Sequence, residues 1–366
     1  MLSVAHLTKK YGALTAVDDL SFTAEEGRIY GLLGPNGAGK STTMNMITGY
    51  LAPGSGSVVI DGIDLLSQPE KAKRNIGYLP EQPPVYPDMT VSEYLDFASR
   101  IKKLSREDRE KSIREVTERT GLDSVSGRLI RNLSKGFRQR LGLAQAILGD
   151  AKLLILDEPT VGLDPGQIVE IRELIRSLSG ERTVILSSHI LQEVSAVCDH
   201  IMVLSHGRLV ASDTTEHLSL SAGASERLYI SARADEQTMR DILSGFRDGL
   251  ECGSEEETEE GVTRLSIRVN GDEDIREEVF RVFAAEGKAL LELTLKRETL
   301  EDTYLRLIAE GEAEAEKEAE EKTEDETESE AEAESETETE SETETESEAG
   351  EKPEDEEKTG QEAGEV

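Results

Sequence analysis

Cysteine is scarce in this sequence, where Cys198 and Cys252 are the only two. Two thiols so far apart form neither a disulfide framework nor a metal site, which is typical of a reducing compartment. No N-terminal run resembles a signal peptide, and no stretch approaches 18 consecutive apolar residues. A basic patch rich in aromatics is also missing, so nucleic acid is not an expected ligand. We therefore expect a cytoplasmic chain that does not itself cross a membrane.

Negative charge is concentrated at the C-terminal end. Residues 310–366 contain 28 acidic residues and 4 lysines, which account for 24 of the 36 net negative charges. Glutamate occupies alternate positions from Glu328 to Glu348. Such a segment has nothing to bury and repels itself, so we predict a disordered acidic tail over 310–366. A solvating tail is the plainer interpretation, and binding of basic partners or cations is the alternative.

The preceding 309 residues show the pattern of an α/β protein. Four apolar runs, GRIYGLLG, AKLLILDEP, RTVILSSH and HIMVLSHG, predict buried strands of a mostly parallel sheet within residues 1–218. A helical subdomain is expected at about 88–149, with helix starts near Thr90, Ser105 and Ser134. A polar linker follows at 219–226. Residues 227–309 then predict a small α/β domain of three strands and two helices, closed by the amphipathic helix ETLEDTYLRLIAE.

A phosphate-binding loop follows the first of these strands. GPNGAGKST fits the pattern G-x-x-x-x-G-K-[ST] and precedes a helical stretch, which is the context that the motif requires. Successive backbone N–H groups would cradle the phosphates, Lys40 would reach the β- and γ-phosphates, and the Ser41 hydroxyl would ligate Mg²⁺. The predicted ATP-binding residues here are Gly34, Pro35, Asn36, Gly37, Ala38, Gly39, Lys40, Ser41 and Thr42.

Three further polar residues follow predicted strands of the same sheet. Asp157 and Glu158 end the run KLLILDEP, where ligands of parallel sheets gather. Asp157 is the predicted Mg²⁺ ligand. Glu158 is the predicted general base, and we expect it to point away from Asp157 because side chains alternate along a strand. His189 ends the run VILSSH and is expected to contact the γ-phosphate or the attacking water.

Together these motifs resemble those of the ATP-binding cassette (ABC) ATPases over residues 2 to about 218. The resemblance implies that Tyr11 stacks on adenine, and that Gln82 reaches Mg²⁺ and couples catalysis to a membrane partner. It also implies that Asp164, in GLDP, belongs to the loop after the Asp157–Glu158 strand. LSKGFRQR stands in the place of the family signature, with Ser134, Lys135, Gly136 and Phe137 at its core. Lys135 and Phe137 depart from the commonest signature, LSGGQ.

The resemblance implies a fold, an activity and partners. The fold is a P-loop NTPase cassette with an inserted helical subdomain, and the activity is Mg²⁺-dependent ATP hydrolysis. Two cassettes would pack head to tail, so that one chain's signature helix, a good anion site at its N-terminus, caps the partner's γ-phosphate. The signature and GLDP regions are most similar to those of exporter ATPases whose permease is a separate chain. This predicts a homodimer or paired ABC subunit, bound to permease chains on the inner face of the membrane.

Two other functions stay open on sequence alone. One is a soluble ribosome- or DNA-associated ABC protein, although such chains usually carry two cassettes or a coiled-coil insertion. The other is a regulatory ATPase that uses residues 227–309 as a sensor. The cargo of a transporter would be recognised by its permease, so this chain does not reveal it.

Overall fold

The computed structural model describes residues 1–218, 225–246, 252–254, 261–270, 274–297 and 299–313. Residues 1–312 form one unit, and all but one residue of the second unit, 313–366, lie outside the described ranges. The predicted disorder of the acidic tail therefore concerns residues outside the described part, apart from its first four. Those four, 310–313, are helical rather than disordered.

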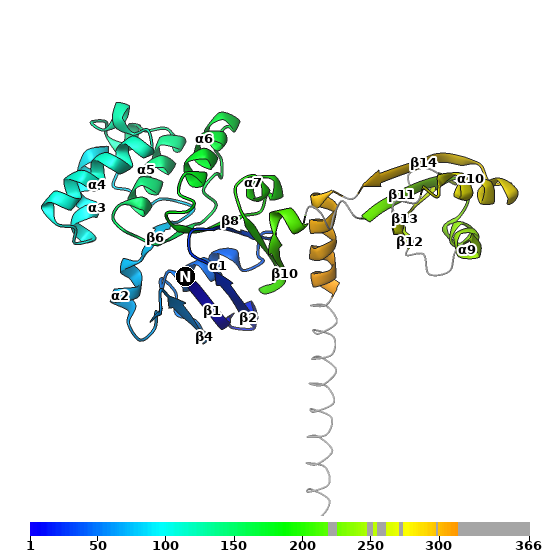
Figure 1. Cartoon of the computed structure of the whole chain (residues 1–366), viewed down its shortest axis with the longest axis horizontal. Coiled ribbons are helices and arrows are strands. Elements are labelled where there is room, and N and C mark those ends of the chain that lie inside the picture. Colours follow the sequence, from blue (N-terminus) through cyan, green and yellow to red (C-terminus); the bar gives the residue numbers. More distant parts are fainter. Residues whose placement is uncertain (219–224, 247–251, 255–260, 271–273, 298, 314–366) are drawn as a thin grey trace, which may run out of the picture. The chain divides into compact units, whose positions relative to one another are not determined.

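The N-terminal part of the chain is built on a six-stranded central sheet with the strand order β10-β9-β3-β8-β7-β6; Figure 1 labels its strands β6, β8 and β10. Five of its strands run parallel, and β10 alone is antiparallel, pairing with β9. All residues of β3, β7 and β8 are buried, because both faces of the sheet are covered. This confirms the expected parallel-rich sheet. Its strands are β3 (Ile29–Leu33), β6 (Ile76–Leu79), β7 (Leu153–Leu156), β8 (Thr183–Ser188), β9 (His200–Ser205) and β10 (Arg208–Thr214).

A second, antiparallel sheet was not anticipated from the sequence. Its order is β2-β1-β4-β5, and its apolar side chains share a core with helix α1 and one face of the central sheet. Only alternate residues of β2 are buried along much of its length, so these strands lack the long apolar runs of the central sheet. The elements are β1 (Leu2–Tyr11), β2 (Leu14–Ala24), α1 (Lys40–Ile47), β4 (Ser55–Ile60), β5 (Ile63–Asp64) and the neighbouring α2 (Pro69–Arg74).

Three mutually contacting helices lie between β6 and β7 in the sequence, as predicted (Figure 1). They are α3 (Val91–Ile101), α4 (Arg106–Arg119) and α5 (Lys135–Ile147). Their N-caps are Thr90, Ser105 and Ser134, each of which accepts a backbone N–H at its side-chain oxygen. Two short 3-10 helices, Asp123–Val125 and Ile130–Asn132, connect α4 to α5. Helices α6 (Pro165–Arg176) and α7 (Leu191–Ser195) flank β8 in the sequence and join the same core as α3–α5.

The C-terminal part of the unit is a small α/β domain with its own core. Its four antiparallel strands have the order β12-β13-β11-β14, and the element order is β-α-β-β-α-β. The short strand β12 was not predicted, and β11 begins at Ser225, so the last two residues of the expected linker are strand. The elements are β11 (Ser225–Ala232), α9 (Glu236–Phe246), β12 (Cys252–Ser254), β13 (Thr263–Asn270), α10 (Arg276–Ala285) and β14 (Leu290–Arg297).

The closing helix, over residues 300–313, packs differently from the expectation. We expected it to complete the small domain. Its apolar side chains instead pack against the core of the central sheet and α3–α7. Gly311 lies so close to Ser205 and Val210 that a Cβ there would approach Val210 to 2.7 Å. These core-facing residues are Leu300, Tyr304, Leu307 and Ile308.

Candidate active site

The predicted phosphate loop connects β3 to the first turn of α1. Gly39 has a left-handed φ of 96°, and a Cβ there would lie 2.5 Å from the carbonyl oxygen of Ala16. A Cβ on Gly34 would lie 2.4 Å from the carbonyl oxygen of Leu204. Glycine is therefore required at both positions for the loop to keep this path. No side chain caps α1, so its first N–H groups remain available to an anion.

Lys40 is held at the mouth of this loop. Its Nζ donates to the carbonyl oxygens of Gly34 (2.8 Å) and Pro35 (3.0 Å), and lies 3.8 Å from Oε1 of Glu158. Burial lowers the pKa of Lys40, and the nearby carboxylates of Glu158 and Asp157 partly oppose that shift. The ammonium group is thus fixed beside the loop, as recognition of a polyphosphate requires.

The two carboxylates after β7 have different surroundings. Asp157 is 4% exposed and accepts hydrogen bonds at Oδ1 from the hydroxyls of Ser187 (2.6 Å) and Ser41 (3.2 Å). Glu158 has other partners than Asp157, as expected. The reason that we gave, alternation of side chains along a strand, is wrong. β7 ends at Leu156, and Glu158 has a φ of 47°, which is unusual for a residue with a side chain. A left-handed backbone turn therefore directs the Glu158 carboxylate.

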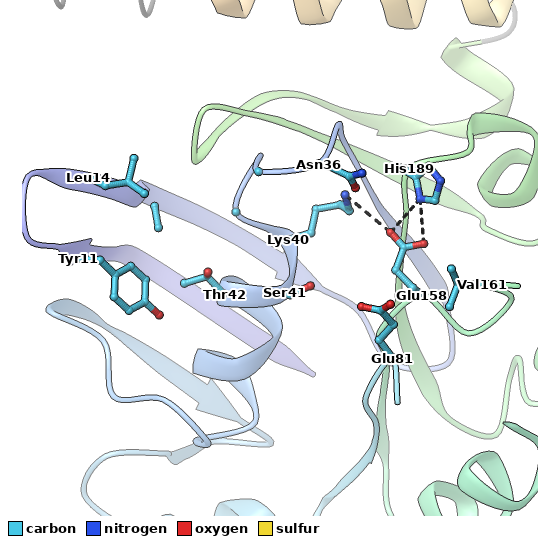
Figure 2. A pocket seen from close by; sticks show the side chains of 13 residues that line it. Tyr11, Leu14, Asn36, Lys40, Ser41, Thr42, Glu81, Glu158, Val161 and His189 are labelled. Atoms are coloured by element: carbon cyan, nitrogen blue, oxygen red, sulfur yellow. Dashed lines mark hydrogen bonds and ion pairs between the residues drawn. The ribbon is translucent and has the colours of Figure 1, made fainter. Parts of the chain in front are cut away.

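Glu158 and His189 meet at the ends of neighbouring strands. The His189 Nδ1 atom lies 3.1 Å from Oε2 and 3.2 Å from Oε1 of Glu158 (Figure 2). The Glu158 side chain is 11% exposed and that of His189 is 40% exposed, so the pair is accessible from one side. The Glu158 backbone N–H also donates to Ser187 Oγ at 2.9 Å. Such a carboxylate is suited to accept a proton.

These groups surround one cavity of about 440 Å³. Figure 2 shows the Glu158 and His189 side chains beside Lys40, with Tyr11 and Leu14 toward the other end. Tyr11 is 50% exposed, and the Lys9 ammonium lies 5.7 Å from the centroid of its ring. The cavity thus brings together most of the predicted ATP-binding residues with Glu158 and His189. Its lining comprises Tyr11, Leu14, Ala16, Asn36, Gly37, Gly39, Lys40, Ser41, Thr42, Glu81, Glu158, Val161 and His189.

Gln82 and the signature helix lie outside this lining. Gln82 and Lys135 line a separate cavity of about 310 Å³, together with Arg138, Gln139 and the shared residues Glu81 and Val161. Ser134 is exposed and caps α5 by accepting the Phe137 N–H at 3.3 Å. A chain whose own signature residues do not line its own phosphate site fits the expectation that they act on a partner's site.

The remaining signature and loop residues make contacts within the chain. A Cβ on Gly136 would lie 2.5 Å from the Oε1 atom of Gln167, so the end of that side chain packs directly against the glycine. The Lys135 ammonium lies against Gly162, because a Cβ on Gly162 would come within 2.1 Å of Nζ. Phe137 is half-buried against the core, and Asp164 caps α6 by accepting the Gln167 N–H at 3.0 Å. The signature and the GLDP loop are therefore packed on one another.

Some site residues were missed from the sequence. Glu81 and Val161 line both cavities, and Leu14 lies beside Tyr11. Ser187 contacts both Asp157 and Glu158. Its position at a strand end, two residues before His189, could have indicated that it belongs to the site. Glu81 directly precedes Gln82, and this position could likewise have indicated a site residue.

The donor set beside the phosphate loop fits Mg²⁺. The Ser41 Oγ and Asp157 Oδ1 atoms lie 3.2 Å apart, and hydroxyl and carboxylate oxygens are the hard ligands that Mg²⁺ prefers. Within the described ranges no group of three or more His, Cys, Asp or Glu side chains forms a metal site. Magnesium in nucleotide sites is usually bound by one or two protein ligands together with substrate phosphates and water. Gln82, the third predicted ligand, does not line the nucleotide cavity.

Comparison with known proteins bears on this site and on the whole chain. Residues 17–161 match the family model described as "ABC transporter". The bacitracin transport ATP-binding protein BcrA of Bacillus licheniformis is 34% identical over 313 residues, which cover 85% of this chain and 98% of the relative. The linearmycin resistance ATP-binding protein LnrL of Bacillus subtilis (strain 168) is 32% identical, with 84% of this chain and 98% of the relative covered.

A solved structure is similar to the N-terminal part of the chain. It is the dimeric, post-hydrolysis state of the ATP-binding cassette MJ0796, bound to ADP and Pi. The TM-score is 0.54 and the identity 26%, with 59% of this chain and 99% of the other covered. In the described ranges no helix is long and apolar enough to span a membrane.

Proposed function

This chain belongs to the family of ABC transporter ATP-binding proteins, and on that premise we propose that it energises export through separate permease chains. It is an ATPase that converts ATP and water to ADP and phosphate, and its fold is that of a P-loop NTPase cassette. The observation that carries the proposal is the single cavity that unites the phosphate loop with Lys40, Glu158 and His189.

We propose the following roles for the residues of this cavity. The phosphate loop and Lys40 bind the β- and γ-phosphates, and Tyr11 stacks on the adenine. Glu158 takes a proton from the water that attacks the γ-phosphorus, as the bond to the bridging oxygen of ADP breaks. His189 contacts the Glu158 carboxylate and orients it. Ser41 and Asp157 would hold Mg²⁺, which supplies charge neutralisation on the phosphates.

The second half of each site would come from a partner cassette. Ser134 and Gly136 lie at the N-terminus of α5, outside their own chain's nucleotide cavity. The similar cassette MJ0796 is dimeric in its ADP- and Pi-bound structure, which supports a head-to-tail dimer here. Gln82 and Asp164 would then transmit the state of the nucleotide to the permease and to the partner. Such a chain acts as a peripheral subunit on the inner face of the membrane.

Export is the transport direction that the full-length relatives support. Their names describe bacitracin transport and linearmycin resistance, so these compounds are the first cargo candidates. The comparisons offer no support for a regulatory or ribosome-associated ATPase. We place the cargo-binding surface in the permease, since this chain supplies the cavity in which ATP is hydrolysed.

Reconstitution tests this function directly. The chain and a candidate permease that copurifies with it are co-expressed and placed in vesicles, and Mg²⁺-dependent phosphate release is measured with and without each candidate compound. Stimulation of phosphate release, together with ATP-dependent movement of the compound, is the expected result. Hydrolysis that needs no permease and responds to no membrane partner would overturn the transport role and favour a regulatory ATPase.

A further inference from the structure

We propose that Glu193 is a positioning residue that holds Glu158 and His189 in their mutual geometry, a role that rests on the function proposed above. Glu193 lies on α7, outside the nucleotide cavity, and is 8% exposed. Its Oε2 accepts hydrogen bonds from the hydroxyl of Thr160 and from that of Ser188, the latter at 3.3 Å. The carboxylate therefore joins two loops from inside the protein.

The two loops are the ones that carry the proposed catalytic pair. Thr160 follows Glu158 by two residues, and Ser188 directly precedes His189. The Glu158–His189 contact bridges these loops at the cavity, and the Thr160–Glu193–Ser188 contacts bridge them a second time beneath it. The Ser188 hydroxyl also accepts the Ile190 N–H at 3.1 Å, which ties the backbone on both sides of His189 to the same point.

Burying the Glu193 carboxylate costs free energy, and packing alone would not require a carboxylate at this position. Across the described residues no ion pair includes Glu193, and the hydrogen bonds to its buried carboxylate come from the Thr160 and Ser188 hydroxyls. Burial of a carboxylate without a cation is unfavourable, and an apolar side chain would fill the same space at lower cost. An acceptor is needed here to fix two hydroxyls at one point. Glu158 needs such support, because its left-handed φ of 47° is intrinsically strained.

The bridge predicts an effect on turnover rather than on ATP binding. Neither Glu193 nor Thr160 lines the nucleotide cavity, so their loss leaves the phosphate loop and Tyr11 in place. A shift of Glu158 relative to His189 would misplace the base, and a displacement of about 1 Å can lower a rate by roughly 10²-fold. KM for ATP should therefore change little while kcat falls.

Three variants and a matched control test this proposal. Glu193→Leu removes the acceptor at similar volume, whereas Glu193→Gln keeps an oxygen that accepts from both hydroxyls. Thr160→Val removes one donor. The control is Thr183→Val at the opposite end of β8, where the buried Thr183 hydroxyl donates to the Glu25 carbonyl and accepts the Gly27 N–H, both at 3.2 Å. Each threonine variant removes the side-chain hydrogen bonding of one buried residue.

The measurements are kcat, KM for ATP, melting temperature and the ring NMR signals of His189, assigned by their loss in His189→Ala. Glu193→Leu and Thr160→Val should lower kcat at least about tenfold, with KM within about threefold of wild type. Both should shift the His189 signals, and Glu193→Gln should restore kcat and signals together. Thr183→Val should lower the melting temperature about as much as Thr160→Val does, and should leave kcat within about twofold of wild type.

Two outcomes would overturn the proposal. One is a kcat within threefold of wild type in Thr160→Val, which stays informative even if Glu193→Leu does not fold. The other is an equal loss of kcat in Thr183→Val, which would make the effect one of general stability. Failure of the proposed function is a separate observation, namely that Glu158→Gln retains hydrolysis.

Discussion

His189 Nδ1 lies 3.1 Å from Oε2 of Glu158, although the two residues are 31 positions apart and follow different strands. The parallel pairing of β7 with β8 brings these strand ends together, and the left-handed turn at Glu158 directs its carboxylate toward the ring. Because Lys40 Nζ also lies 3.8 Å from Glu158, one carboxylate contacts both the phosphate loop and the histidine. The proposed base therefore contacts residues from both the phosphate-loop side and the β8 side of the cavity.

Glu158→Gln should abolish most hydrolysis while preserving the fold and ATP binding. The amide keeps the size of the side chain and a contact with His189, but it accepts no proton from water. We expect phosphate release to fall roughly 10²-fold or more, since general-base catalysis contributes 10²–10⁴-fold. Gel filtration should show an ATP-bound dimer that accumulates. Retention of more than about a tenth of wild-type turnover would rule out Glu158 as the base.

Ser187→Ala should weaken the response to Mg²⁺. The Ser187 hydroxyl donates to Asp157 Oδ1 at 2.6 Å and orients the proposed ligand, and loss of such a partner typically lowers metal affinity 10–100-fold. The Mg²⁺ concentration for half-maximal hydrolysis should rise about tenfold. A matched control is Ser205→Ala at the end of β9, because Ser205 is equally buried and its Oγ has no hydrogen-bond partner among the described residues. An unchanged Mg²⁺ response in Ser187→Ala would contradict the assignment of Asp157.

The central sheet and the phosphate loop could be predicted because their signals are local. Four continuous apolar runs gave four of the buried strands, since both faces of this sheet are covered. The helix starts at Thr90, Ser105 and Ser134 were predicted because capping depends on one hydroxyl and its own first turn. The glycines at 34 and 39 were predicted through their spacing, and the close backbone contacts of both explain that spacing.

Features that depend on distant segments could not be predicted in this way. The β1–β2–β4–β5 sheet pairs strands whose polar outer faces dilute the apolar signal. The turn at Glu158 follows from the anchoring of its N–H on Ser187, 29 residues away. The closing helix was predicted as a helix, but its amphipathic pattern does not say which core it joins, and it joins that of the central sheet.

Two truncations should separate the closing helix from the acidic tail. Removal of 314–366 takes away a segment whose sequence is mostly acidic and small residues and offers few apolar side chains to bury, so hydrolysis and melting temperature should change little. Removal of 299–366 also takes away Leu300, Tyr304, Leu307 and Ile308, which pack against the central core. This longer truncation should lower the melting temperature by several degrees. A similar drop on removal of 314–366 alone would show that the tail packs on the folded unit.

Ser134→Arg should block dimerisation on ATP without blocking ATP binding. Ser134 is exposed at the start of α5 and does not line the nucleotide cavity of its own chain. Arginine there would place a bulky side chain where a partner's γ-phosphate should meet the helix N-terminus. The isolated variant should bind ATP with nearly normal affinity and lose hydrolysis. Phe137→Gln, the commoner residue of the family signature, should cost less than tenfold, or about 1.4 kcal/mol.

Mixing two inactive variants then tests whether the site is shared. In a head-to-tail dimer of one Lys40→Ala chain with one Ser134→Arg chain, both defects fall on the same composite site, and the other site is intact. The mixture should therefore regain part of the wild-type phosphate release if one intact site turns over alone, whereas neither variant does so by itself. If each site were complete within one chain, Ser134→Arg would either be harmless or prevent ATP binding by the isolated chain. Either result would refute the shared site, because the exposed Ser134 would then have no role toward a partner's phosphate.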